Sequence, residues 1–436
     1  MINHHKVGLS LSGGGYRAAA FHLGTLRKLD ELGVLNNVDV LSTISGGSIT
    51  GAAYCLSDKP FKEFDKEMAD TLSSKSVIRY VLFSWRSLFF YLVIVSVLGA
   101  LFILPFTGMA WLSPVVLITM ITMICLFQFK LWPVSTIIEK AYDSFFFHNA
   151  KLSALCERPL LAIGSTNIET CRPFTFSKKK MEDSSYAYRK PPIKFKHEEF
   201  PISKAVMASS CVPFAFTPVR IGKAYFINEC DAKEINPQLV DGGVYDNQGI
   251  QKITQPGSSY ECDIIITSDA GNTFPFTKSC NNVFVLLIRT MDVFMTRIKN
   301  FQMAQHLYSN TNYANKSIAY FSLGWDIRNC IPGFIDNLIA GKITTAVKAA
   351  HNIPREWLEN PSGHREEIAD LLERNTNYKK IIQSEIKPEQ LKVARNVGTN
   401  LTQLTKEQIC FLSGHAAVMT ELQTRLYCPE LLTIIP

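Results

Sequence analysis

A serine in a tight turn is the first residue of this 436-residue chain whose surroundings suit catalysis. Ser45 follows the apolar run Val38–Ile44 and precedes Gly46 and Gly47, after which the sequence is that of a helix. A strand, a sharp turn bearing serine and a helix make up a nucleophile elbow, whose usual pattern is G-x-S-x-G. Thr43 replaces the first glycine here. The helix N-terminus would favour a developing oxyanion, although an ordinary turn that caps a helix accounts for the same residues.

Three consecutive glycines form a second candidate element, followed closely by Arg17. Consecutive glycines let backbone N–H groups point at one spot, which makes a nest for a phosphate or an oxyanion. The dinucleotide pattern G-x-G-x-x-A is also met, but no acidic residue ends the second predicted strand as that site requires. The chain has no G-K-S or G-K-T, so a P-loop is excluded. We therefore expect an oxyanion hole for the serine, built from the backbone of Gly13, Gly14, Gly15 and Gly46.

A carboxylate on a tight turn is the third candidate. Asp241 precedes two glycines, and a carboxylate close to a serine can take its proton as general base. A plain turn is the alternative, since the acids that follow are too few and wrongly spaced for a calcium loop. None of the nine histidines lies in a turn typical of a catalytic base. His22 falls inside a predicted helix, and only His415 merits a test as the base of a Ser-His triad.

The elements that must position these residues alternate between strands and helices. Strands are predicted at Val7–Leu11 and Val38–Ile44, each followed by a glycine turn and a helix, the first helix being Tyr16–Leu32. This repetition indicates a parallel α/β sheet, in which both turns lie at the carboxyl ends of strands. We expect a three-layer α/β fold with a mostly parallel central sheet and a largely helical C-terminal third. Further strands are predicted at Pro159–Ile168, Pro173–Ser177 and Cys262–Ser268.

One segment has membrane composition, because residues 87–129 contain no charged side chain. It divides into Leu88–Leu104 and Met109–Phe129, separated by four residues of turn composition. A bilayer core about 30 Å thick needs about 20 apolar residues per helix, and both stretches come near that length. The sequence therefore predicts a hydrophobic helical hairpin (77–133) inserted into a discontinuous catalytic domain (1–76 and 134–436). A shallow re-entrant hairpin and a pair of buried core helices are the alternatives.

The charges that flank this hairpin predict its orientation. Arg79 and Arg86 precede it and Lys130 follows it, so the positive-inside rule places both ends, and the catalytic domain, on the cytoplasmic side. The N-terminus lacks the long apolar core of a secretory signal, which agrees with that expectation.

Composition limits the other classes of function. The net charge of +7 is mild, and it suits anionic lipid better than nucleic acid. Hydrophobic content of 47% with 19% charged residues excludes a disordered chain. The eleven cysteines form no C-x-x-C pair or zinc cluster, so we expect reduced thiols and no metal. The basic stretch Lys178–Lys196 is either a solvated loop or a patch for lipid headgroups.

Taken together and in this order, the three motifs resemble those of the patatin-like phospholipases, lipid acyl hydrolases related to cytosolic phospholipase A2. The resemblance covers residues 6–53 and, less tightly, 155–272. It implies a Ser-Asp dyad of Ser45 and Asp241, a glycine-rich oxyanion motif with Arg17 at its basic position, and no metal or organic cofactor. The segments Ala208–Phe214 and Ser268–Gly271 look like two further blocks of the family. Thr43 is the departure from the family pattern, and the hairpin lies outside its usual core.

The expected function is therefore hydrolysis of fatty-acyl esters in membrane phospholipid or lysophospholipid, as in a phospholipase A or lysophospholipase, with the lipid bilayer as partner. Two alternatives stay open. An acyltransferase or thioesterase would use the same elbow with another acceptor or ester, and a membrane-anchored scaffold would carry an inactive site.

Overall fold

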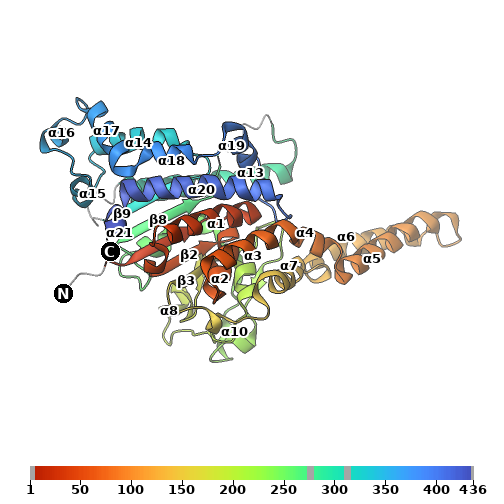
Figure 1. The fold of residues 1–436 in the computed structure, drawn as a ribbon. Helices are drawn as coiled ribbons and strands as arrows, with labels where there is room; N and C mark the ends of the chain where they lie inside the picture. The colour runs from red at the N-terminus through yellow and green to blue at the C-terminus, as the bar shows by residue number, and fades with distance from the viewer. Residues whose placement is uncertain (1–4, 273–278, 309–315, 434–436) are drawn as a thin grey trace.

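The computed structural model describes residues 5–272, 279–308 and 316–433, which form an α/β body from which a helical hairpin projects (Figure 1). A nine-stranded sheet lies at the centre of the described part of the chain. Five adjacent strands run parallel in the order β3-β2-β1-β8-β9. They are Leu160–Asn167, Val40–Ile44, Val7–Leu11, Ile264–Asp269 and Ser317–Ser322.

Four antiparallel strands complete the sheet beside β3, so the prediction of a mostly parallel sheet is confirmed. They are β4 (Arg172–Phe176), β5 (Met181–Asp183), β6 (Val219–Arg220) and β7 (Gln238–Asp241). The central strands are buried throughout, as expected for apolar runs covered on both faces.

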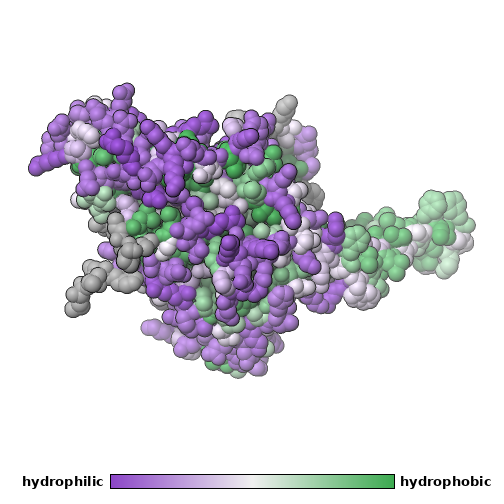
Figure 2. Space-filling model, in the orientation of Figure 1, coloured by the Kyte–Doolittle hydropathy of each residue, from purple (hydrophilic) through white to green (hydrophobic). Residues whose placement is uncertain are grey.

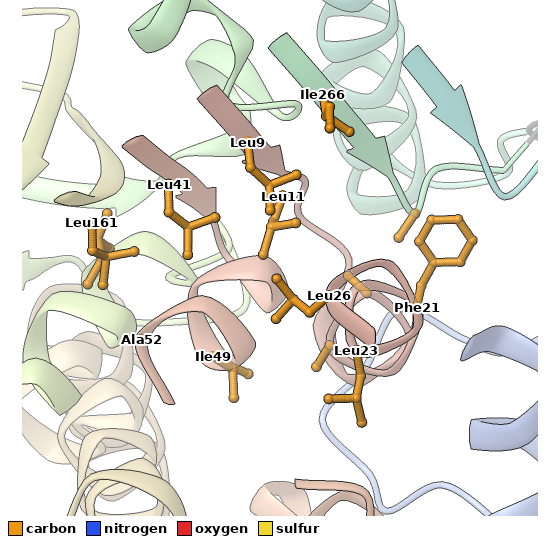
Figure 3. Close-up of a cluster of buried hydrophobic side chains, with 14 of the residues drawn as sticks. Leu9, Leu11, Phe21, Leu23, Leu26, Leu41, Ile49, Ala52, Leu161 and Ile266 are labelled. Carbon is orange, nitrogen blue, oxygen red and sulfur yellow. The ribbon is translucent and has the colours of Figure 1, made fainter. Parts of the chain in front are cut away.

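Helices cover both faces of the sheet. On one face, Leu9, Leu41 and Ile266 pack against α1 (Gly15–Glu31) and α2 (Gly46–Leu56), as Figure 3 shows. On the other face, Val40 and Ile265 pack in a smaller cluster with the short helix α12 (Ile250–Thr254). The expected three layers are therefore present, with a thin second helical layer.

The C-terminal third closes the larger face. Helix α20 (Lys406–Tyr427) lies along α1, and the two backbones approach closely at Gly24, where a Cβ atom would lie 2.0 Å from the Ser413 carbonyl oxygen. Strand β9 adds an edge to the sheet. Helices α14 (Cys330–Ile339), α17 (Arg365–Thr376) and α18 (Tyr378–Gln383) pack around α20. This part of the chain is thus built into the body.

The hairpin consists of α5 (Trp85–Ile103) and α6 (Leu112–Leu131). The first helix begins three residues earlier than predicted and the second three residues later. Both are long and apolar enough to cross a membrane, and almost none of their residues is buried. Their hydrophobic surface is the green projection in Figure 2. The alternative of buried core helices is therefore wrong.

The base of the hairpin is fixed by a tryptophan. Trp132 Nε1 donates to the buried Ser87 hydroxyl at 3.1 Å, and the Trp132 ring stacks on Phe90 with centroids 5.5 Å apart. These contacts join the start of α5 to the end of α6, so the two ends of the hairpin lie side by side.

The basic stretch Lys178–Lys196 surrounds β5 and α8 (Ser184–Ala187). Lys178 pairs with Glu157, and Lys180 pairs with Glu182. Arg189 pairs with Glu234. Several of these cations are therefore neutralised by acids of the body, and α8 lies away from the hairpin (Figure 1), which favours the interpretation as a solvated face.

Candidate active site

Ser45 occupies a strained turn between β2 and α2. Its backbone has φ 49° and ψ −116°, a conformation that side chains other than glycine rarely adopt. The strain is sustained by a hydrogen bond from the Ser45 N–H group to the Ser209 hydroxyl at 2.9 Å. The side chain is 6% exposed, so the hydroxyl lies in a sheltered site. This geometry is that of a nucleophile elbow.

The replacement of the first elbow glycine by Thr43 is accommodated on the opposite side of the turn. A Cβ atom at Gly51, one turn into α2, would lie 2.6 Å from the Thr43 methyl group. The Thr43 hydroxyl accepts a hydrogen bond from the Ser48 hydroxyl at 3.0 Å. The missing side chain at Gly51 of α2 thus makes room for the Thr43 methyl group, so strand and helix remain closely packed at the elbow.

Asp241 ends β7, where it pairs with Ser165 of β3. Its Oδ1 accepts from the Gly243 N–H group at 2.7 Å. Burial raises the pKa of Asp241 to about 6, although the Gly243 N–H group and the nearby Ser45 side chain lower it. The structure therefore brings together the serine and the carboxylate that the sequence singled out, 196 positions apart (241 − 45).

Ser209 links these two residues. Its hydroxyl accepts from the Ser45 N–H group and donates to the Gly164 carbonyl at 2.6 Å, and its carbonyl accepts from the Gly242 N–H group at 3.1 Å. It ends helix α9 (Ile202–Ser209). The sequence placed Ser209 in a block bordering the site but offered no signal for this bracing role, because a serine at a helix end has many uses.

The glycine loop lies beside Ser45. A Cβ atom at Gly13 would lie 3.2 Å from Ser45 Cβ, and one at Gly46 would lie 2.1 Å from the Gly15 carbonyl oxygen. Gly14 and Gly15 have positive φ values of 139° and 58°, which glycine adopts without strain. The loop and the elbow are therefore in direct contact, as the sequence predicted for two glycine turns at neighbouring strand ends.

The backbone amides of the loop are not all free. The Gly13 N–H group donates to the Asn247 carbonyl at 3.0 Å. The N–H groups of Gly14, Gly15 and Gly46 donate to no other group within the described residues. Glycine at position 13 thus allows the loop to approach Ser45 closely, whereas the N–H groups of Gly14, Gly15 and Gly46 remain available for an oxyanion.

The buried side chain of His22 holds the loop from behind. The His22 ring donates from Nε2 to the Ser12 carbonyl and accepts at Nδ1 from the Ser268 hydroxyl, both at 2.9 Å. Burial lowers the pKa of His22 to about 4, so the ring is neutral. His415 contacts Glu385 instead. His22 is thus part of the packing, as the sequence indicated, while His4 lies outside the described residues.

Arg17 supports the loop through the C-terminal third. Its Nη1 donates to the Val397 carbonyl at 3.3 Å, and the Tyr16 N–H group donates to the Asn400 carbonyl at 2.9 Å. Burial lowers the pKa of the Arg17 guanidinium, while nearby Asp269 raises it. The predicted basic residue is therefore a brace between the glycine loop and residues 397–400, which no sequence pattern had connected.

Helix α13 (Val283–Gln302) covers the Asp241 turn. Met295 Cε lies 3.2 Å from the place of a Cβ atom on Gly243. Lys299 pairs with the buried Asp269 at 2.6 Å, which anchors the helix to the end of β8. No sequence pattern indicates that α13 covers the Asp241 turn. Within the described residues, no cluster of three or more histidine, cysteine or acidic side chains could hold a metal ion.

The comparisons with known proteins agree with this geometry. A family model described as patatin-like phospholipase matches residues 9–251, more than half of the chain, including both Ser45 and Asp241. The chain belongs to this family. The resemblance deduced from its motifs is thereby confirmed.

Solved structures give a weaker likeness. Human GIVD cytosolic phospholipase A2 aligns with 98% of this chain at 15% identity and a TM-score of 0.49, and this chain spans 60% of that protein's chain. VipD from Legionella pneumophila aligns with 99% of this chain and 92% of its own at 15% identity and a TM-score of 0.34. No curated protein sequence matches the chain.

Proposed function

We propose that the protein is a membrane-associated lipid acyl hydrolase of the phospholipase A or lysophospholipase type, with Ser45 and Asp241 as its catalytic dyad. The observation that carries the proposal is that the buried Asp241 carboxyl lies close enough to the Ser45 side chain for that side chain to lower its pKa, with Ser209 bonded to the backbone on both sides. A carboxylate in this position can accept the serine proton without a histidine.

The proposed reaction has two halves. Asp241 takes the proton of the Ser45 hydroxyl while the oxygen attacks the ester carbonyl, and the N–H groups of Gly14, Gly15 and Gly46 stabilise the oxyanion, each worth roughly 3–4 kcal/mol in related sites. The leaving alcohol receives the proton from Asp241. Asp241 then deprotonates a water molecule that attacks the acyl-serine, which releases the fatty acid and returns the proton to Ser45. Arg17 positions the loop.

The hairpin gives a physical reason for the substrate class. We propose that residues 77–133 embed α5 and α6 in the bilayer, with the catalytic domain (1–76 and 134–436) on the cytoplasmic side. At 1.5 Å per residue, the 19 residues of α5 extend about 28 Å, close to the thickness of the hydrocarbon core. The active site is then held at the surface where long-chain esters are concentrated.

Mass spectrometry of phospholipid vesicles tests the proposal. The wild type should release fatty acid and lysolipid, whereas Ser45→Ala and Asp241→Asn should release neither. Ser73→Ala changes a surface serine whose hydroxyl bonds only to the Asp70 carbonyl, and it should match the wild type. Release by Ser45→Ala would contradict the proposed nucleophile, and acyl transfer to added alcohols in preference to water would make the protein an acyltransferase.

A further inference from the structure

A cavity of about 730 Å³ lies where the hairpin joins the body. It is bordered by α4 (Val77–Leu82), the first turn of α5, and α7 (Val134–Tyr142) with the turn that follows it. No residue of the Ser45 elbow, the glycine loop or the Asp241 turn lines it. The cavity is therefore separate from the candidate active site.

The lining of this cavity is cationic. It contains four basic side chains and no acidic one, and the four are Lys75, Arg79, Arg86 and Lys140. In the part of the chain that the structure describes, none of them forms an ion pair. Glu139 of α7 does not line the cavity, although the adjacent Lys140 lowers the pKa of Glu139. Among the described residues these four cations therefore form no salt bridge, unlike Lys178, Lys180 and Arg189.

Aromatic rings accompany the cations. The Lys75 ammonium lies 5.8 Å from the centre of the Phe145 ring, and Tyr80 meets the same ring edge-on at 5.6 Å. Trp85 also lines the cavity and is 73% exposed. Tryptophan, tyrosine and basic residues gather at the membrane–water interface, where a ring contacts the acyl region and a polar group contacts headgroups. The composition is thus that of a surface facing lipid headgroups.

The hairpin fixes the depth of the cavity. Since Trp85 and Arg86 are the first two residues of α5, the cavity lies at the end of the segment proposed to fill the hydrocarbon core. That level is where phospholipid phosphates lie. Guanidinium groups such as those of Arg79 and Arg86 match phosphate oxygens in charge and in geometry.

From these observations we infer that the cavity binds the phosphate of an anionic phospholipid headgroup, as a second lipid site distinct from the one that is hydrolysed. The inference rests on the proposed membrane insertion of the hairpin but does not depend on catalysis. Such a bound lipid fixes the rotation of the body about the hairpin, because α7 belongs to the catalytic domain and α5 to the membrane segment.

The test uses the full chain carrying Ser45→Ala, so that no ligand is consumed. The purified protein in neutral detergent is titrated with dioctanoyl phosphatidylglycerol and with dioctanoyl phosphatidylcholine, and bound lipid is counted by native mass spectrometry. We expect selective binding of the anionic lipid. Adding Arg79→Gln and Lys140→Gln should weaken that binding roughly tenfold or more, because each cation near the lipid surface contributes to it.

A matched control removes two other cations. Lys379→Gln with Lys380→Gln makes the same change of net charge on α18, which packs on α20 and not on the hairpin. This variant should bind phosphatidylglycerol like its parent. Equal weakening in both double variants, or no weakening in the first, would overturn the inference.

Two further measurements distinguish a free-phosphate site and a failure of membrane insertion from the proposed lipid site. Inorganic phosphate at the same concentration should not displace the lipid, and displacement would make this a site for free phosphate. Flotation with phosphatidylcholine vesicles tests membrane insertion alone. Failure to float would refute the hairpin proposal, while loss of selective lipid binding in a protein that does float would refute the cavity.

Discussion

The N–H group of Ser45 donates to the Ser209 hydroxyl at 2.9 Å, so a residue of α9 determines the geometry of the proposed nucleophile. Ser209→Ala removes this acceptor from the Ser45 amide and removes the hydrogen bond that the Ser209 hydroxyl donates to the Gly164 carbonyl. We expect a loss of about 1–3 kcal/mol in stability and a fall in kcat of roughly 10- to 100-fold, with KM little changed.

Thermal unfolding and hydrolysis of a soluble ester measure these two effects. Ser203→Ala is the control, since Ser203 is buried on the same helix and does not contact the elbow. An equal fall in kcat for both variants would show that Ser209 acts through the stability of α9 alone.

The contact between Thr43 and Gly51 predicts an unfavourable response to a helix-favouring substitution. Gly51→Ala would place a methyl group 2.6 Å from the Thr43 methyl, so we expect destabilisation by about 1–3 kcal/mol despite the better helix propensity of alanine. Adding Thr43→Ser removes the clashing methyl, keeps the hydroxyl that Ser48 contacts, and should restore stability. Gly333→Ala on α14, where a Cβ atom would meet nothing within 4 Å, should be neutral or slightly stabilising. Calorimetry of the wild type, Gly51→Ala, Gly51→Ala with Thr43→Ser, and Gly333→Ala measures these changes in stability.

The raised pKa of Asp241 predicts the pH dependence of hydrolysis. A general base acts only when deprotonated, so kcat/KM for a soluble ester should be lost as the pH falls through about 6, rather than near 4 as for an ordinary aspartate. Burial also raises the pKa of Asp246 to about 6, so Asp246 is the other carboxyl that could produce this limb. If Asp241 is the base, Asp246→Asn should keep the same acid limb. His22 cannot produce this limb, because its pKa is lowered to about 4. If the limb moves in Asp246→Asn, then Asp246 rather than Asp241 produces it, and the assignment of Asp241 as base would be wrong.

Replacing residues 88–129 by a short glycine–serine linker tests the hairpin. The contact between Trp132 and Ser87 shows that the two ends are close enough to be joined. We expect a protein that no longer needs detergent and whose activity on vesicles falls by roughly tenfold or more, since anchoring raises the effective concentration of lipid at the site. Activity on soluble short-chain esters should change little, and parallel losses on both substrates would remove the hairpin from the function.

Much of the central fold could be predicted from the sequence. The first strand was predicted at Val7–Leu11 and is found there, because a buried apolar run bounded by glycines has few other uses. The start of α6 was misplaced, since Met109 to Trp111 are as apolar as the helix that follows and composition cannot separate them. Strand β7 was missed because it has only four residues. Strand β9 was missed because it mixes serine and tyrosine with its apolar residues and so lacks a distinctive pattern.

The candidate site was predictable to the extent that local turns define it. Ser45 and Asp241 each sit in a turn with its own signature, and the structure places them together. The bond from Gly13 to the Asn247 carbonyl and the contact of Tyr16 with Asn400 join distant segments through backbone groups. Backbone partners leave no trace in residue type, so these contacts could only be found in the structure.

The dependence of the glycine loop on residues 397–400 has a consequence for biosynthesis. As the chain leaves the ribosome, the hairpin emerges long before Arg17 and Tyr16 can meet Val397 and Asn400. Insertion of the proposed membrane hairpin can thus precede completion of the glycine loop. A nascent chain that already contains Ser45 and Asp241 still lacks the loop contacts on which the proposed reaction depends until residues 397–400 have been made.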